Sequence, residues 1–196
     1  RKQLNNFNIS VGLTEDFIIY FLSGFLVWNF FAQSTGDSCQ CILASGTLIK
    51  KVYVPKTTFV LSSVVSNLIN LGFAMIPLLA LLLILGKGVN LSCLYVVPAL
   101  ILVTWFTLGV SFIVSALSVF FHDFGEMYRV LLTPWMFLTP IMYPMEIIPQ
   151  KYAGLLHLNP MYHLVRCFRD PVYHGTAPEG AALLISIFIA GTTLII

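Results

Sequence analysis

Long uncharged apolar stretches divide the chain and predict its elements. They cover residues 17–36, 57–86, 88–121, 130–145 and 180–196, and each begins directly after a charged residue. A helix of about 20 apolar residues crosses a bilayer, and continuous apolar runs favour helices over barrel strands. We therefore expect an all-α membrane protein, a polytopic helical bundle with crossings at about 17–35, 58–85, 91–120, 130–145 and from 181 onward.

The segments between these runs differ in character. Residues 36–57 form a basic loop, residues 86–90 a tight turn, residues 122–129 a mixed-charge loop, and residues 146–179 the longest connector. The polar residues 1–16 are expected to be a loop between spans, which implies that an earlier span precedes them. The last span is expected to be truncated, because the final apolar run is still apolar at residue 196. The excess of Lys and Arg that marks cytoplasmic loops does not decide the topology, because four lie on one predicted side and six on the other.

The run 130–145 is short for a span and contains Pro134, Pro140 and Pro144. Sixteen helical residues cover about 24 Å, and proline kinks or ends a helix. Non-helical backbone at membrane depth persists only where protein or water satisfies it, so this segment is predicted to line something internal.

A short helix is predicted in the connector 146–179. Asn159 suits the cap and Pro160 the first position, while Met161, Leu164, Val165 and Phe168 fall on one apolar face. The opposite face carries Tyr162, Arg166, Arg169 and Asp170, and Pro171 is expected to end the helix. Such a helix is too short to span, so we expect an interfacial or re-entrant element.

Composition excludes several classes of function. The chain is 58% hydrophobic and 9% charged with a net charge of +2, which excludes a soluble domain and gives no reason to expect a nucleic-acid partner. No nucleotide-binding loop occurs, and no charged side chain lies mid-span, where ion-coupled carriers place one. The cysteine and histidine spacings match no metal site, and His122-Asp123 is a weak catalytic pair at a span end.

Aromatic residues gather in two of the runs. Trp28, Phe30 and Phe31 lie in the first, and Trp135, Phe137 and Tyr143 in the proline-containing one. These side chains fit either a belt at the membrane interface or a lining for a sugar-bearing substrate.

The basic loop contains an amphipathic segment. Leu48, Ile49, Val52 and Tyr53 share an apolar arc of about 140°, with Lys50 and Lys51 outside it and Pro55 as the stop. It fits an interfacial helix on anionic lipid or a short helix that docks into a groove of a soluble partner.

Taken in order, five motifs resemble the permease subunits of ABC exporters for lipid-linked polysaccharides such as O-antigen, capsule and teichoic acid. The chain carries SGFLVWNFF at 23–31, LIKKVYVPK at 48–56, SALSVFFHD at 115–123, TPIMYP at 139–144, and LNPMY at 158–162 followed by Phe168-Arg169 and 173–175. It departs from the family at Val27, where proline is frequent, and at Ser45, Gly46 and Thr47, where asparagine is common.

The resemblance implies one exporter transmembrane domain over residues 1–196, in the bacterial cytoplasmic (inner) membrane, that binds no cofactor itself. Residues 36–57 would be cytoplasmic, and residues 146–180 an external gate region. A partner ATPase would bind ATP and Mg, the permease would form a homodimer in membrane lipid, and the aromatic residues would line the path of a lipid-linked glycan. The coupling helix would comprise Leu48, Ile49, Lys50, Lys51, Val52, Tyr53, Pro55 and Lys56, and the gate Asn159, Pro160, Met161, Tyr162, Arg166 and Arg169.

Two other functions stay open at this point. One is an ABC exporter of a drug or a smaller lipid. The other is a multispan membrane enzyme acting on lipid-linked sugars, for which His122 and Asp123 would be the residues to replace.

Overall fold

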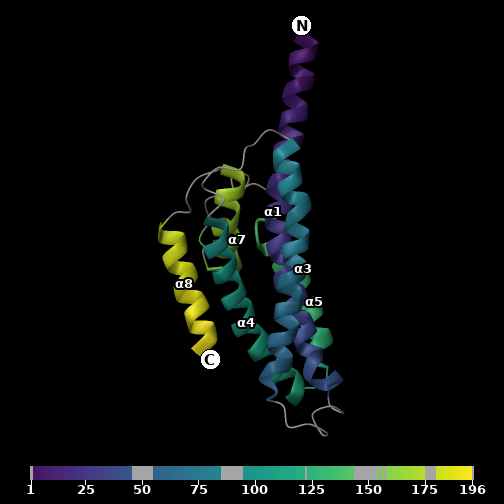
Figure 1. Ribbon diagram of the computed structural model, residues 1–196, viewed down its shortest axis with the longest axis vertical. Helices are drawn as coiled ribbons and strands as arrows, with labels where there is room; N and C mark the ends of the chain where they lie inside the picture. The colour runs from purple at the N-terminus through teal and green to yellow at the C-terminus, as the bar shows by residue number, and fades with distance from the viewer. Residues whose placement is uncertain are drawn as a thin grey trace.

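The computed structural model of the chain, shown in Figure 1, describes residues 2–45, 55–84, 95–121, 123–143, 154, 156, 158–174 and 180–195. Within these ranges the backbone forms helices and the turns between them, with no strand. The elements are α1 (Lys2–Ala44), α3 (Thr57–Ile84), α4 (Val96–Phe120), α5 (Phe124–Leu138), α7 (Pro160–Arg169), the π-helical turn η3 (Asp170–His174) and α8 (Gly180–Ile195). The prediction of an all-α bundle is confirmed.

Three helices are long and apolar enough to cross a membrane: Phe17–Ile42 within α1, all of α3, and all of α4. The crossings predicted at 58–85 and 91–120 match α3 and α4 closely. Helices α5 and α8 have 15 and 16 residues, which is short for a bilayer of about 30 Å. Five crossings therefore remain a prediction, with three helices of sufficient length in the described part of the chain.

Two segments that were predicted to be loops are helical and belong to α1. Helix α1 runs without interruption for 43 residues, about 64 Å at 1.5 Å per residue, roughly twice the thickness of the hydrocarbon core. The segment from Lys2 to Asp16 was expected to be a loop, but it lacks proline and continues the helix (Figure 1). The same holds for residues 36–44, which belong to α1 and not to the basic loop, because no proline occurs there and Ser38 and Cys39 are buried against the bundle.

Helix α5 begins in the segment that was predicted as a mixed-charge loop. Its first turn carries Glu126, which favours a helix N-terminus, so most of residues 122–129 is helical. The helix ends at Leu138, because Thr139 precedes Pro140 and adopts an extended backbone with φ −97° and ψ 126°. The run 130–145 is thus a helix that breaks at Thr139 and not a continuous crossing.

Small polar side chains allow α1 and α4 to pack at the centre of the bundle. Helix α4 buries Thr107, Ser111, Ser115 and Ser118, which fall on one face, and small residues let membrane helices approach closely. Most of these hydroxyl groups donate hydrogen bonds to backbone carbonyl oxygens of the same helix. The Thr107 Oγ1 atom, for example, donates to the Val103 carbonyl oxygen at 2.7 Å. The Ser115 and Ser118 hydroxyls do the same, so three of the four are satisfied without water. The Ser111 hydroxyl has no hydrogen-bond partner within the described chain.

Helix α4 also meets α8 closely at Gly109. A Cβ atom added there would lie 2.5 Å from the Thr193 carbonyl oxygen, whereas one added at Gly72 on α3 would meet nothing within 4 Å. Glycine at position 109 thus sets the distance between α4 and α8.

We predict that Gly109→Ala lowers the free energy of unfolding by about 1–3 kcal/mol, because two backbones must separate. Gly72→Ala is the matched control and should be neutral or stabilising, because alanine favours a helix over glycine. Thermal unfolding of both variants in detergent measures the difference. Equal melting temperatures would contradict the close contact between α4 and α8.

Candidate functional site

The break after α5 is joined to the start of α7 by the side chain of Asn159, which is 5% exposed. Its Oδ1 atom accepts from the Met161 backbone amide at 3.1 Å and from the Trp135 Nε1 atom at 3.1 Å. Its Nδ2 atom donates to the Thr139 hydroxyl at 2.9 Å, and that hydroxyl donates to the Trp135 carbonyl oxygen at 3.1 Å. The predicted cap is confirmed, and the same amide also closes a buried ring of hydrogen bonds across the break.

A second contact between the same segments comes from Arg169 at the end of α7, which is 6% exposed. Its Nη1 atom donates to the Pro140 carbonyl oxygen at 3.0 Å, an acceptor that the end of α5 makes available. The guanidinium carbon lies 3.7 Å from the centroid of the Tyr20 ring, a cation–π arrangement. Its Nη2 atom lies against Gly24, where a Cβ atom would clash, so glycine at that position admits the arginine.

Burial is the main influence on the ionisation of Arg169. Removal from water lowers the pKa of the guanidinium. The nearby Tyr20, Asp170 and Tyr162 side chains raise the pKa and so offset part of that effect. Breaking such a buried charge away from its partners is costly, so Arg169 holds α7 to α1 and to the end of α5.

Helix α7 is more deeply buried than its amphipathic pattern predicts. The predicted polar face was expected at the membrane interface, yet Tyr162 and Arg169 are buried along with Met161 and the other apolar positions. The helix packs against α1, α4 and α8, so its polar side chains face protein. Arg166 is only half-buried, and its Nε atom lies 3.7 Å from an Asp170 carboxylate oxygen. The residues predicted to form a gate therefore belong to one packed unit, here called the α7 unit: Asn159, Pro160, Met161, Tyr162, Arg166 and Arg169.

Helix α7 ends at Arg169 with Asp170 as its C-cap, directly before the proline that was predicted to end it. The chain continues from α7 into the π-helical turn η3, Asp170–His174, with Pro171 inside it. Proline has no amide proton, and its ring clashes with the carbonyl four residues earlier. A wider turn relieves that clash without ending the helical path.

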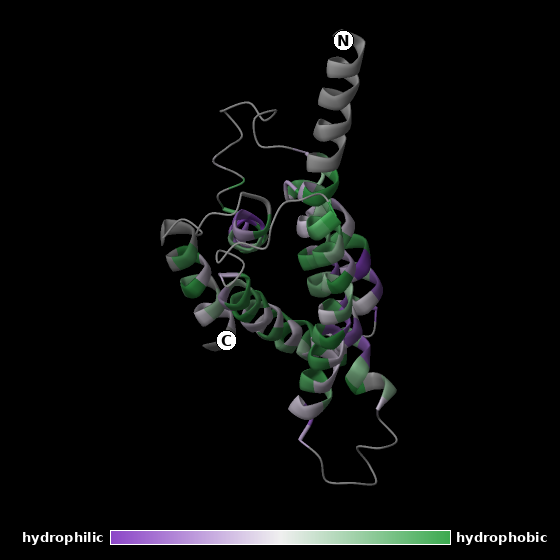
Figure 2. Ribbon diagram, turned by 45° about the horizontal axis from the view of Figure 1, so that its top comes forward, coloured by the Kyte–Doolittle hydropathy of each residue, from purple (hydrophilic) through white to green (hydrophobic). Residues whose placement is uncertain are grey.

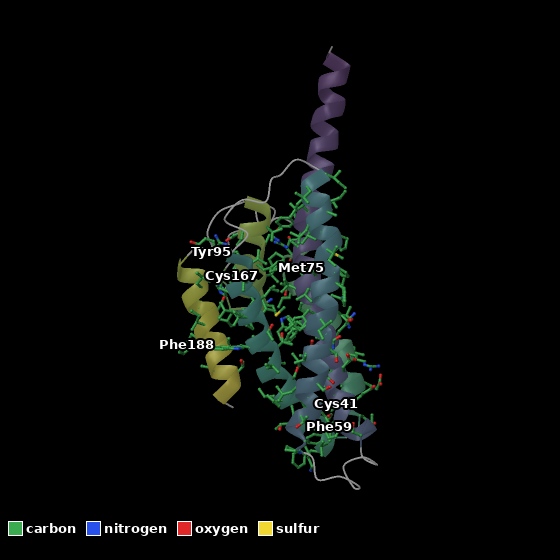
Figure 3. The ribbon with its side chains drawn as sticks, viewed as in Figure 1. Cys41, Phe59, Met75, Tyr95, Cys167 and Phe188 are labelled. Atoms are coloured by element: carbon green, nitrogen blue, oxygen red, sulfur yellow. The ribbon has the colours of Figure 1, made fainter. Side chains whose placement is uncertain are left out.

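Figure 3 marks Cys167, whose side chain lies between α7 and α8. Its Sγ atom is 3.6 Å from the Ser186 hydroxyl. Phe188, labelled in the same figure, is on the outer side of α8 and exposed. One side of α8 thus covers the α7 unit, and the other faces away from it.

Four aromatic rings from three helices form a single cluster. The Trp28 and Phe31 rings of α1 each meet Trp135 of α5 edge-on, with centroids 6.1 and 5.3 Å apart. Phe31 also stacks on Phe106 of α4 at 5.6 Å. Edge-on and offset contacts of this kind are favourable, and the cluster positions the tryptophan that bonds to Asn159.

The predicted channel aromatics thus have different surroundings. Trp28, Phe30 and Phe31 are buried in the core, and Trp135 is half-buried. Phe137 is exposed, and the hydroxyl of half-buried Tyr143 donates to its carbonyl oxygen at 2.9 Å. Contact of these residues with a glycan stays a prediction, and packing between helices is the role for which the structure gives evidence.

A row of polar side chains on α1 was missed by the sequence analysis. Asn29, Gln33, Asp37 and Gln40, here called the polar strip, follow one another at spacings of 4, 4 and 3 residues within the span Phe17–Ile42. The spacing was a visible signal, but the predicted end of the span at residue 35 divided the strip between a helix and a loop. Asp37 lies within the span Phe17–Ile42, near its end and not at its middle, so it does not contradict the prediction that no charged side chain lies mid-span.

The predicted coupling helix falls almost entirely outside the described residues. This applies to Leu48, Ile49, Lys50, Lys51, Val52 and Tyr53, whereas Pro55 and Lys56 are described and exposed just before α3. Figure 3 labels Cys41 and Phe59 at the end of the bundle where α1 ends and α3 begins. The basic segment therefore connects two long helices at one end of the bundle, and its role stays a prediction.

Comparison with known proteins adds independent information. The family model of the ABC-2 type transporters matches residues 2–173. The chain is 26% identical over 162 residues to the O-antigen export system permease protein RfbA of Klebsiella pneumoniae, covering 82% of this chain and 62% of that protein. It is 32% identical over 176 residues to the protein of the same name from Myxococcus xanthus, covering 86% and 66%.

A further relative is the polysialic acid transport protein KpsM of Escherichia coli, 25% identical over 186 residues, covering 88% of this chain and 70% of that protein. The chain thus spans less than two thirds of the length of the O-antigen permeases it matches.

We predict that Asn159→Ala lowers the free energy of unfolding by about 2 kcal/mol or more, because it removes the cap and leaves buried donors without acceptors. Asn159→Ser should have a smaller effect, because serine can cap the helix without reaching Trp135. Leu158→Ala, at an exposed neighbouring position, is the control. Thermal unfolding in detergent ranks the variants, and an Ala variant as stable as the control would refute the role of the amide.

Proposed function

Since the chain belongs to the ABC-2 type transporter family, we propose that it is the transmembrane subunit of an ATP-driven polysaccharide exporter. The cargo would be a lipid-linked glycan of the O-antigen or capsule type, moved outward across the bacterial cytoplasmic membrane. The subunit would act as a homodimer and take its energy from ATP hydrolysed, with Mg, in a separate cytoplasmic partner.

The observation that carries this proposal is the agreement among the relatives' names. Permeases named for O-antigen export and a transport protein named for polysialic acid match more than four fifths of this chain. Two chemically different polysaccharides are involved, which favours glycan export in general. None of these names mentions a drug or a sugar-modifying reaction, and this makes a drug exporter and a membrane enzyme the weaker candidates.

The hydrogen bonds that link the end of α5 to α7 support a gate formed by these residues. Asn159 joins Thr139 to the start of α7, and Arg169 joins Pro140 to the end of α7 while also contacting Tyr20 of α1. Both Asn159 and Arg169 are buried. Such a unit moves as one body when the helices around it shift, because its hydrogen bonds have no replacement partners in an apolar environment. A gate that opens for a long polymer and recloses requires this cohesion.

The connection between α1 and α3 supports the proposed link to an ATPase. A short helix formed by Leu48–Lys56 would dock on the ATPase and transmit its closure upon ATP binding to the two long helices. The three lysines of this segment would contribute to docking through charge, and anionic lipid would be the competing partner.

We predict that deleting the gene removes a surface polysaccharide while the intracellular glycan pool remains, since synthesis does not depend on export. Affinity purification of the tagged subunit should recover an ATPase, identified by mass spectrometry. Unchanged surface glycan together with altered drug resistance would favour a drug exporter instead. Sugar-modifying activity of the purified subunit that is lost upon replacing His122 or Asp123 would favour an enzyme.

We predict that the double variant Lys50→Glu and Lys51→Glu loses glycan export and the stimulation of ATP hydrolysis while still accumulating in the membrane. Charge reversal replaces attraction by repulsion at the docking surface. Lys87→Glu, in the predicted turn 86–90 on the other side, is the control for a lysine charge reversal elsewhere and should export normally. Normal export and ATP hydrolysis by the double variant would contradict docking through this segment.

A further inference from the structure

The polar strip Asn29, Gln33, Asp37 and Gln40 is unusual for a membrane helix. At 3.6 residues per turn its members lie within about 80° of one another around α1 and extend over about 16 Å. Gln33, Asp37 and Gln40 are exposed and Asn29 is half-buried. Figure 2 shows hydrophilic residues along one side of the paired long helices, beside turns that are largely hydrophobic.

Part of the strip is held in place by hydrogen bonds. The Gln33 Nε2 atom donates to the Asn29 Oδ1 atom at 3.3 Å. The Asn67 Nδ2 atom of α3 donates to the Asp37 carboxylate at 2.8 Å, and Asn67 is itself buried. These bonds leave the Asn29 amide nitrogen, the Gln33 carbonyl oxygen and the second Asp37 oxygen available for partners outside the described chain.

The neighbouring helix extends the same polar surface. On α3, Ser63 precedes Asn67 by four residues and Ser66 precedes it by one, while Asn70 follows it by three. Ser66 and Asn70 are exposed. The joint surface of α1 and α3 thus offers amides, hydroxyls and a single carboxylate over the half of α3 that follows Lys56. The following turns of α3 carry Phe73 and Ile76, which are exposed and apolar.

Lipid is a poor partner for this surface. Hydrocarbon provides no hydrogen-bond donor or acceptor, and polar groups left unpaired in it are costly. A second copy of the chain is also disfavoured, because a strip that meets itself across a twofold axis brings two Asp37 carboxylates toward each other. Water and hydroxylated molecules remain, and an amide matches a hydroxyl well because each of them both donates and accepts.

We propose that the polar strip is a binding surface for the sugar chain in transit, lining a water-filled path along α1. This proposal rests on the proposed export function and names the part of the chain that the polymer contacts. Uncharged amides suit a moving polymer, because each contact is replaced by an equivalent one as the chain advances. The buried aromatic cluster supports the helices behind the strip.

Thiol labelling tests whether the strip faces water. Gln33→Cys is compared with Ile69→Cys on the exposed apolar face of α3, with the wild-type chain and its four cysteines as the blank. A charged maleimide applied to permeabilised membranes should label position 33 about tenfold faster or more, because thiolate forms in water and apolar surroundings suppress it. Equal rates would mean that the strip faces lipid. An oxidative cross-link between two copies at position 33 would show that the strip is an interface between subunits. Either result overturns the proposal.

Export by leucine variants tests contact with the sugar chain. The triple variant Asn29→Leu, Gln33→Leu and Gln40→Leu keeps Asp37 and its bond to Asn67, and should lower surface polysaccharide by about fivefold or more at equal membrane abundance. Ile69→Leu is the control and should export normally. Wild-type export by the triple variant would overturn the proposal, whereas failure of the wild-type gene to restore export in a deletion strain would overturn the proposed function itself.

Discussion

The structure depends on one constraint: hydrocarbon offers no hydrogen-bond partner, so polar groups at membrane depth need partners within the protein or water beside it. Hydroxyl groups such as those of Thr35 and Thr107 satisfy it locally by donating to carbonyl oxygens of their own helix. Asn159 satisfies it between segments, by joining the end of α5 to the start of α7. The exposed members of the polar strip satisfy it only in part, because the Gln33 carbonyl oxygen and the second Asp37 oxygen stay free after the bonds to Asn29 and Asn67. We therefore assign the strip to water and sugar hydroxyls.

The helix break at Thr139 links this constraint to function. Pro140 forces an extended residue before it, and the carbonyl groups freed at the break become acceptors. Arg169 bonds to one of them and reaches it only because Gly24 leaves room on α1. A proline, a glycine and an arginine far apart in the sequence therefore form one unit. The unit holds a short buried helix between longer ones, and this cohesion is the basis on which we propose it as a gate.

Local signals in the sequence predicted local structure well. Asn159-Pro160 marked the start of α7 correctly, because a cap and its helix are determined by neighbouring residues. The apolar runs marked α3 and α4. The length of α1 was missed, because polar composition indicates a loop, whereas the absence of proline before Pro55 allows the helix to continue. The burial of Tyr162 and Arg169 was missed as well, since an amphipathic pattern does not reveal that protein covers the polar face. The strip was visible as a spacing, but a wrong helix end concealed it.

The central claim is that this subunit provides the path for an ATP-driven export of polysaccharide. It is tested most directly in inside-out membrane vesicles that contain the subunit and its ATPase, loaded with the cell's lipid-linked glycan and exposed to an external glycosidase. The account predicts that ATP addition makes the glycan resistant to the enzyme, and that vesicles lacking the subunit show no such change. Equal protection with and without the subunit would contradict it.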